Sequence, residues 1–159
     1  MCQSELALEL GLSEVHSGEI LWKKTLGSPA EIEVSYSADI KRAAALLYEC
    51  GMDFDSIGFL SEVSHALRHG IGVLETAVID GKLCACAVSV DVSGDSALIN
   101  GIAVKKEYRR AGLGMEIMKA MEEKLGGRNL FVFKDKGIND GFYQKAGYGR
   151  HGMWSVAKL

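Results

Sequence analysis

The sequence is poor in proline, in paired cysteines and in long apolar runs, and each shortage excludes a class of protein. With one proline in 159 residues, the chain must make its turns mostly with glycine, which occurs 19 times. The four cysteines form no CxxC pair and no His/Cys cluster with zinc spacing, so no metal is expected. No apolar run approaches a bilayer span, and no signal-like leader opens the sequence. These features predict a cytoplasmic protein without membrane association.

Net charge and chain length restrict the expected class of protein and its partners further. A formal net charge of −3 gives no general basic field, so nucleic acid is not an expected partner. A chain of 159 residues fits one domain and can bury a core without disulfides or structural metals. Cys84 and Cys86 lie two apart in an apolar run, which puts both on one face of a strand. We interpret them as small buried side chains in a reducing compartment.

Hydrophobic periodicity predicts the order of the elements. Helices are expected over residues 4–10, 38–50, 57–69, 115–125 and 138–145, and strands over 14–26, 31–37, 72–79, 82–92, 97–104, 129–133 and 148–158. Asp80-Gly81 predicts a type I′ hairpin, and a second turn at 93–95 completes an antiparallel meander. Gly101 indicates a bulge or a close backbone approach. The helix over 115–125 then forms a crossover to a parallel strand. The fold class is therefore α+β with a mixed sheet.

The stretch RRAGLG, residues 109–114, lies between an apolar strand and an amphipathic helix. The first N–H groups of a helix have no intrahelical partner and carry the positive end of its dipole. Gly112 and Gly114 allow a ligand to approach the main chain, and Arg109 and Arg110 add charged donors. Because the helix lacks a Ser, Thr, Asp or Asn cap, a bound anion can take that place. The loop indicates a pyrophosphate site.

Two other interpretations of this loop stay open on its residues alone. A Gly-x-Gly stretch is also typical of a flexible strand–helix joint with solvated arginines, or of a general nucleotide-binding loop. It is not a P-loop, because no Lys-Ser/Thr follows. It is not a dinucleotide fingerprint, because GxGxxG is absent and the preceding strands form a meander.

The wider context resembles the GNAT superfamily of N-acetyltransferases over residues 31–159. The first signature, a strand ending in apolar-x-Val and then Arg-x-x-Gly-x-Gly, is matched by IAVKKEYRRAGLG, residues 102–114. The second, Phe-Tyr-x-Lys-x-Gly-Tyr on a helix, is matched by FYQKAGY, residues 142–148. The resemblance implies an antiparallel meander, a parallel crossover and a central splay between strands. It also implies residues 1–30 as an N-terminal extension, with an extra helix or strand there as a hypothesis.

The resemblance implies acetyl-CoA as co-substrate, without a metal, and a set of site residues. Loop main chain would hold the pyrophosphate, strand main chain would hold the pantetheine arm, and the Gly101–Ile102 main chain would polarise the thioester carbonyl. Tyr143 would protonate the departing thiolate, since the reference pKa values, ~10 and ~8.5, lie close together. The expected cofactor-binding residues are Ile102, Ala103, Val104, Arg109, Arg110, Ala111, Gly112, Leu113, Gly114, Met115 and Asn139.

The acceptor side departs from the family pattern. Many members carry a glutamate on the third meander strand, where this chain has Asn100. Glu75 on the first meander strand is the candidate substitute, so Glu75 and Asn100 are assigned to the base or substrate side. A small-molecule or peptide amine is the expected partner. A homodimer is left open, and a non-catalytic CoA-binding or regulatory module is the alternative function.

Overall fold

The computed structural model describes residues 11, 13–29, 32 and 39–158. The helix expected over residues 4–10 lies outside them, as does the strand expected over 31–37 except for residue 32. The elements are β1 (Ser13–Lys24), α2 (Ile40–Glu49), α3 (Ser56–Arg68), β2 (Val73–Ile79), β3 (Lys82–Ser89), β4 (Asp91–Ser93), β5 (Ser96–Ile99), β6 (Gly101–Val104), η1 (Lys106–Tyr108), α4 (Leu113–Lys124), β7 (Asn129–Asp135), α5 (Asp140–Lys145) and β8 (Gly149–Lys158). The expected mixed α+β fold is confirmed.

The chain divides into two compact units. One contains residues 23–131, and the other contains residues 1–22 together with 132–159. Strands β1 and β7 each continue from one unit into the other.

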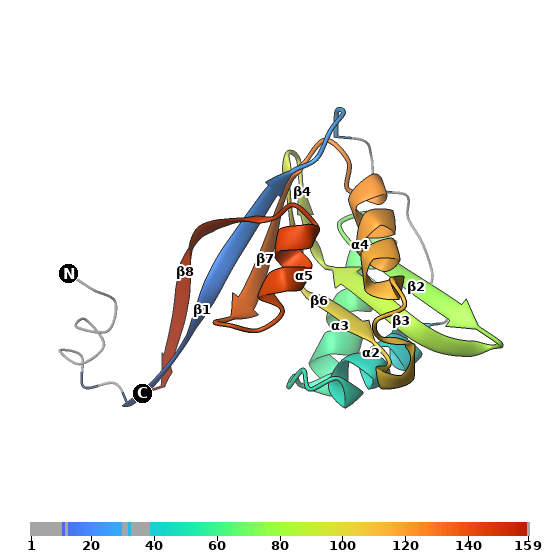
Figure 1. Cartoon of the computed structure of the whole chain (residues 1–159), viewed down its shortest axis with the longest axis horizontal. Helices are drawn as coiled ribbons and strands as arrows, with labels where there is room; N and C mark the ends of the chain where they lie inside the picture. The colour runs from blue at the N-terminus through green and yellow to red at the C-terminus, as the bar shows by residue number, and fades with distance from the viewer. Residues whose placement is uncertain (1–10, 12, 30–31, 33–38, 159) are drawn as a thin grey trace. The chain divides into compact units, whose positions relative to one another are not determined.

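In the unit of residues 23–131, the antiparallel sheet β2–β3–β6 lies between helices. Figure 1 shows α4 on one side of this sheet and α2 and α3 on the other. All residues of β3 after the first are buried, as expected for a strand covered on both faces. The core on the α2–α3 side consists of Ala43, Leu46, Leu47, Val63, Ala66, Leu67, Leu83, Cys86, Val88, Val90 and Ala103.

Asn100 divides what the sequence predicts as one strand over residues 97–104. Its Oδ1 accepts a hydrogen bond from Val90 N at 2.9 Å, and its own N–H donates to Val88 O at 2.9 Å. The Asn100 side chain thus takes the place of a main-chain acceptor for Val90 N. The strands before and after Asn100, β5 and β6, belong to different sheets. β6 stays with β3, whereas β5 pairs with β4 and has β7 as its other neighbour. The start of β7 therefore lies beside β5 and not beside β6, which is the expected central splay.

The two glycine predictions for the meander are confirmed. Asp80 and Gly81 both have positive φ, 49° and 74°, as a type I′ hairpin requires. At Gly101, a Cβ would lie 3.0 Å from Leu47 Cδ2 and 3.1 Å from the Met52 side chain. The glycine therefore permits the close approach of the α2 region to β6.

In the unit of residues 1–22 and 132–159, β7, β1 and β8 are neighbours in that order. β1 pairs antiparallel with β8 from Ser13–Lys158 to Trp22–Gly149. The β1–β8 register shifts between Ser13 and Val15 and again between Ile20 and Leu21, so the ladder has irregular steps at these two places. The short helix α5 belongs to the same unit and is joined to β7 by an ion pair between Lys134 and Asp140.

Replacing Gly18 by alanine should destabilise this second unit. A Cβ at Gly18 would overlap the Lys134 carbonyl oxygen and the Trp154 indole, whose Nε1 donates to that oxygen at 3.2 Å. We expect Gly18→Ala to lower the free energy of unfolding by about 2 kcal/mol through overpacking. The measurement is urea unfolding followed by tryptophan fluorescence. Gly152→Ala is the matched control, because its Cβ would meet only Ile20 Cδ1 at 3.8 Å. Equal midpoints for both variants would contradict the prediction.

Candidate functional site

The main chain of β6 is open on one side. Lys105 N donates to Cys84 O at 2.8 Å, and the register pairs Val104 with Ala85 and Ile102 with Ala87. Because hydrogen-bonded positions alternate in an antiparallel ladder, Ala103 faces β3 like Lys105, and the N–H and C=O groups of Ile102 and Val104 point away from it. β6 is the last strand of its sheet, so no described strand pairs with that edge.

The Arg109 side chain forms a hydrogen bond to one main-chain group of this open edge, the Val104 carbonyl. Its Nε donates to Val104 O at 2.8 Å, and its NH2 lies 3.4 Å from Cys50 Sγ. Cys50 Sγ also lies 3.6 Å from Val104 O. The Arg109 guanidinium therefore fixes the end of β6 to the C-terminus of α2, and the Ile102 groups and the Val104 N–H remain on the edge. Cys50 is a site neighbour that the sequence did not predict, because nothing local relates residues 59 positions apart.

The RRAGLG loop presents consecutive main-chain N–H groups. Met115 N and Glu116 N both donate to Gly112 O, at 2.9 and 3.1 Å. Within the described part of the chain, the N–H groups of residues 110–114 have no main-chain acceptor. Arg110 and Gly112 take positive φ, 68° and 89°, the left-handed conformation that occurs in anion-binding nests.

The space in front of this loop is free. Gly112 is the N-cap of α4, which has no side-chain cap, and a Cβ built on it would meet no atom within 4 Å. Ala111 and the Arg110 side chain are exposed, and Leu113, Gly114 and Met115 are half-buried. Uncapped N–H groups, an exposed cation and open space above a glycine fit a phosphate group. The loop predicted for the pyrophosphate therefore has main-chain donors without a main-chain acceptor and open space at Gly112, and its role as a binding site stays a prediction.

Tyr143 lies on α5, in the other unit, and is buried. Its side chain makes edge-to-face contacts with Phe142 and Tyr148, at centroid distances of 5.1 and 6.0 Å. Its neighbour Phe142 is half-buried, whereas Tyr143 is 6% exposed. Burial raises the pKa of Tyr143 to about 12, against the opposing positive charge of Lys134. Since a thiol has a reference pKa near ~8.5, proton transfer from Tyr143 is less favourable here than its reference value implies.

Asn139 is the N-cap of α5. It takes a positive φ of 56°, and its carbonyl accepts hydrogen bonds from Phe142 N at 3.0 Å and Tyr143 N at 3.2 Å. Its side chain makes no cap hydrogen bond. The main chain of Asn139 therefore sets the start of the helix that carries Tyr143.

Of the two residues assigned to the acceptor side, neither has an uncommitted side chain. The Glu75 carboxylate is 16% exposed, and its Oε1 lies 2.6 Å from Lys124 Nζ, an ion pair by distance without hydrogen-bond geometry. Asn100 donates from Nδ2 toward Asp91 Oδ2 at 3.4 Å, in addition to accepting from Val90. Asn100 therefore shapes the strand break, and Glu75 joins β2 to α4.

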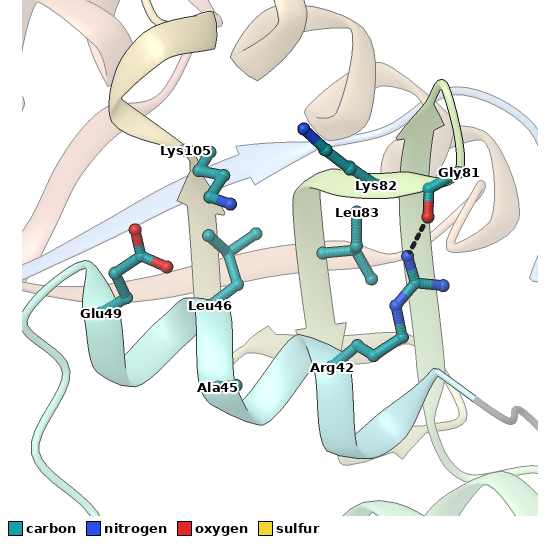
Figure 2. Close-up of a pocket in the computed structure, with 8 residues that line it drawn as sticks. All are labelled: Arg42, Ala45, Leu46, Glu49, Gly81, Lys82, Leu83 and Lys105. Carbon is teal, nitrogen blue, oxygen red and sulfur yellow. Dashed lines mark hydrogen bonds between the residues drawn. The ribbon is translucent and has the colours of Figure 1, made fainter.

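A separate pocket of about 310 Å³ lies between α2 and the β2–β3 hairpin. Figure 2 shows the Arg42 guanidinium bonded to Gly81 O, at 2.8 Å, and the Lys105 side chain over Leu46. Three cationic side chains and one carboxylate line it, so its lining carries positive charge. None of the residues predicted from the sequence line this pocket, whose residues are Arg42, Ala45, Leu46, Glu49, Gly81, Lys82, Leu83 and Lys105.

The cysteines of β3 are buried as expected. The Cys84 and Cys86 thiols donate to Lys82 O and Ala43 O, at 3.2 and 3.8 Å. Burial raises the pKa of Cys86 to about 12, so its thiol stays protonated. Among the described residues, no three His, Cys, Asp or Glu side chains gather where they could hold a metal ion. No helix in the described ranges is long and apolar enough to cross a membrane.

Comparison with solved structures shows the fold. The chain is similar to a GCN5-related N-acetyltransferase from Sphaerobacter thermophilus, with 13% identity and a TM-score of 0.70, covering 97% of this chain and 54% of the other. It is similar to one from Kribbella flavida, with 19% identity and a TM-score of 0.68, covering 98% and 63%. The ribosomal-protein-S18-alanine N-acetyltransferase of Escherichia coli has 18% identity and a TM-score of 0.62, covering 79% and 91%.

The chain spans about half the length of the first of these structures, and no curated protein sequence matches it. A family model does match: the acetyltransferase (GNAT) domain covers residues 68–150, more than half of the chain. That range contains the open edge of β6, the RRAGLG loop and the helix of Tyr143. The family match and the fold agree with the resemblance drawn from the two sequence signatures, and the chain belongs to the GNAT acetyltransferase family.

Proposed function

We propose that this protein transfers the acetyl group of acetyl-CoA to a primary amine of a small molecule or peptide. Acetyl-CoA, the co-substrate of GNAT domains, supplies an activated acyl group. The observation that carries the proposal is the row of N–H groups at residues 110–114, which lack a main-chain acceptor within the described chain, together with the open edge of β6. Both belong to the unit of residues 23–131.

The loop holds the pyrophosphate in this proposal. The N–H groups from Arg110 to Gly114 donate to its oxygens, and the exposed Arg110 side chain adds a charge-assisted donor. Arg109 remains a proposed contact to the pyrophosphate, and its Nε also bonds Val104 O. Arg109 therefore holds the loop in shape, and its charge contributes to the local field.

The open edge of β6 receives the pantetheine arm. The main-chain groups of Ile102 and the N–H of Val104 form hydrogen bonds to its amides, as an added strand would. At the Gly101–Ile102 end, the main chain polarises the thioester carbonyl. Ala103 turns its own main chain toward β3 and holds the edge in place, and Asn139 remains a proposed contact to the same arm.

Tyr143 gives its proton to the departing sulfur in this proposal. The support is its place in the second signature and within the family match. No side chain is assigned as base, because Glu75 is ion-paired with Lys124 and Asn100 carries an amide that bonds Val90 N. The amine therefore arrives neutral or loses its proton to water.

A non-catalytic CoA-binding module is the second candidate function. The observation that favours it is Asn100, whose committed amide stands where many members have an acid. A thiol-release assay with acetyl-CoA and a panel of amines, run beside calorimetry with CoA and ATP, separates the candidates. Turnover with one amine supports the enzyme. Tight CoA binding without turnover supports the module, and equal affinity for ATP and CoA supports a general nucleotide site.

The pH dependence of turnover follows from the pKa of Tyr143. Because burial raises this pKa to about 12, the neutral phenol persists throughout the range below it. We expect kcat/KM to rise from pH 7 to 10 as the amine loses its proton, with no fall caused by Tyr143. Initial rates of thiol release across this range test the expectation. A fall above pH 8.5 that disappears in Tyr143→Phe would contradict it.

A further inference from the structure

Lys134 is the buried centre of an ion cluster in the unit of residues 1–22 and 132–159, in which the Glu19 side chain is 18% exposed and that of Asp140 is 62% exposed. The Lys134 side chain is 6% exposed, and its Nζ lies 2.7 Å from Glu19 Oε2 and 2.6 Å from Asp140 Oδ1. It also donates to Asp135 O at 3.2 Å. Arg150 Nε lies 3.7 Å from Glu19 Oε1 on the outer side. We call Glu19, Lys134 and Asp140 the Lys134 cluster.

The cluster joins three elements at the start of the helix that carries Tyr143. Glu19 comes from β1, Lys134 from β7, and Asp140 is the first residue of α5. α5 has six residues and no side-chain cap, so local interactions cannot stabilise it alone. Tyr143 follows Asp140 by three residues, which puts both on neighbouring positions of the helix surface. The position of Tyr143 therefore depends on the anchor at Asp140.

The charges in the cluster act on one another. Burial alone would lower the pKa of Lys134, but the hydrogen bonds that Lys134 donates to Asp140 and Glu19 outweigh it and raise this pKa. Lys134 therefore stays protonated, and its charge opposes the effect of burial on the pKa of Tyr143. A buried cation requires carboxylate partners at hydrogen-bond distance, and Glu19 is the more shielded of the two partners of Lys134.

We propose that the Lys134 cluster is a positioning element for Tyr143: Asp140 fixes the helix, and Lys134 supplies the positive charge that stabilises the tyrosinate formed during acetyl transfer. This inference rests on the proposed role of Tyr143. It brings β1 into the reaction through Glu19, although β1 lies outside the family match at 68–150.

The proton balance of the step is closed. Tyr143 Oη gives its proton to the departing sulfur while the C–S bond breaks and the C–N bond to the amine forms. The amine nitrogen releases one proton to water, and the Tyr143 oxygen regains one from water. No oxidant, reductant or further reactant is required. The tyrosinate exists only between these transfers, and Lys134 acts on it there.

The test removes the charge of Lys134 and observes Tyr143 directly. Lys134→Met should lower kcat about 10-fold, with the KM for acetyl-CoA within about twofold, since it affects a proton transfer and not CoA binding. Incorporated 3-fluorotyrosine, a more acidic phenol, gives a ¹⁹F signal for residue 143, assigned by its loss in Tyr143→Phe. Its titration midpoint should move to higher pH in Lys134→Met. An unchanged midpoint would overturn the proposal.

Two further variants separate charge from packing. Lys134→Arg keeps the charge and should retain kcat within about threefold of wild type, with the same midpoint. Equal losses in Lys134→Arg and Lys134→Met would overturn the electrostatic role. If circular dichroism shows that Lys134→Met is unfolded, Lys134→Met/Glu19→Met replaces it, because it leaves no buried unpaired carboxylate at Glu19.

Glu122→Gln is the matched control for loss of an ion pair. It breaks the ion pair of Lys23 and Glu122, which lies in the other unit. This pair has the same 2.7 Å separation as Lys134 and Glu19, and its carboxylate is similarly buried. Glu122→Gln should leave both kcat and the fluorine midpoint unchanged. Tyr143→Phe tests the underlying function: full activity in that variant rejects the role of Tyr143. A lowered kcat in Tyr143→Phe together with an unchanged midpoint in Lys134→Met rejects the role of the Lys134 cluster and keeps the role of Tyr143.

Discussion

Gly112→Asp should weaken CoA binding at least about 100-fold, which is the size expected when a carboxylate replaces open space at a phosphate site. Gly112 has a φ of 89°, and a Cβ there would meet no atom within 4 Å, so the substitution introduces no clash in the free protein. The added carboxylate instead occupies the space above the N–H groups and repels the pyrophosphate. Isothermal titration calorimetry with CoA measures the effect.

Gly112→Asn separates charge from shape in the same experiment. Asn and Asp have nearly the same size, and both tolerate the left-handed conformation better than other side chains. We expect Gly112→Asn to lose only a few-fold in affinity, since it is neutral and can donate from its amide. If Asp and Asn weakened binding equally, the loop would not be holding an anion. If neither did, CoA would bind elsewhere.

Tyr143→Phe should lower kcat by about 100-fold or more, with the KM for acetyl-CoA nearly unchanged, because general acid catalysis contributes about 10²–10⁴-fold. The phenylalanine ring keeps the edge-to-face contacts with Phe142 and Tyr148, so packing is preserved. Thiol release at saturating acetyl-CoA gives kcat, once an accepting amine has been found.

Tyr148→Phe is the control for this variant. Tyr148 is as buried as Tyr143, 6% exposed, and belongs to the same seven-residue signature. Removal of its hydroxyl should leave kcat within about threefold, because Tyr148 is assigned no proton transfer in the proposed reaction. Equal losses in both variants would indicate a structural role for the two phenols, and wild-type activity in Tyr143→Phe would reject its catalytic role.

Much of the fold could be predicted because local sequence carries the signal. The strand and helix periods placed α2, α3, α4 and β2 within a few residues of their observed bounds, and Asp80-Gly81 identified its hairpin. The uncapped start of α4 in the RRAGLG loop could be predicted for a similar reason. Free N–H groups at a helix start and the conformational needs of glycine depend on neighbours in sequence, not on distant packing.

The features that the sequence did not reveal all join distant segments. The sequence did not reveal that Arg109 bonds Val104 O and approaches Cys50. Asn100 was interpreted as a departure from an acidic position, and the structure shows that its amide breaks a strand by bonding Val90 N. Nothing in the sequence indicated the ion pairs of Lys134, because its partners Glu19 and Asp140 come from separate elements. A single lysine in a polar stretch gives no local sign of burial.

By itself, the sequence determined the order of elements, the loop, the second signature and, through them, the family. Each depends on residues within about one element of each other, where propensity and backbone geometry act directly. Only the tertiary structure decided that β6 has an open edge, that burial raises the pKa of Tyr143 to about 12, and that β1 supplies Glu19 to Lys134. Pairing, desolvation and charge interaction depend on which groups meet in space, and that is settled when the segments fold together.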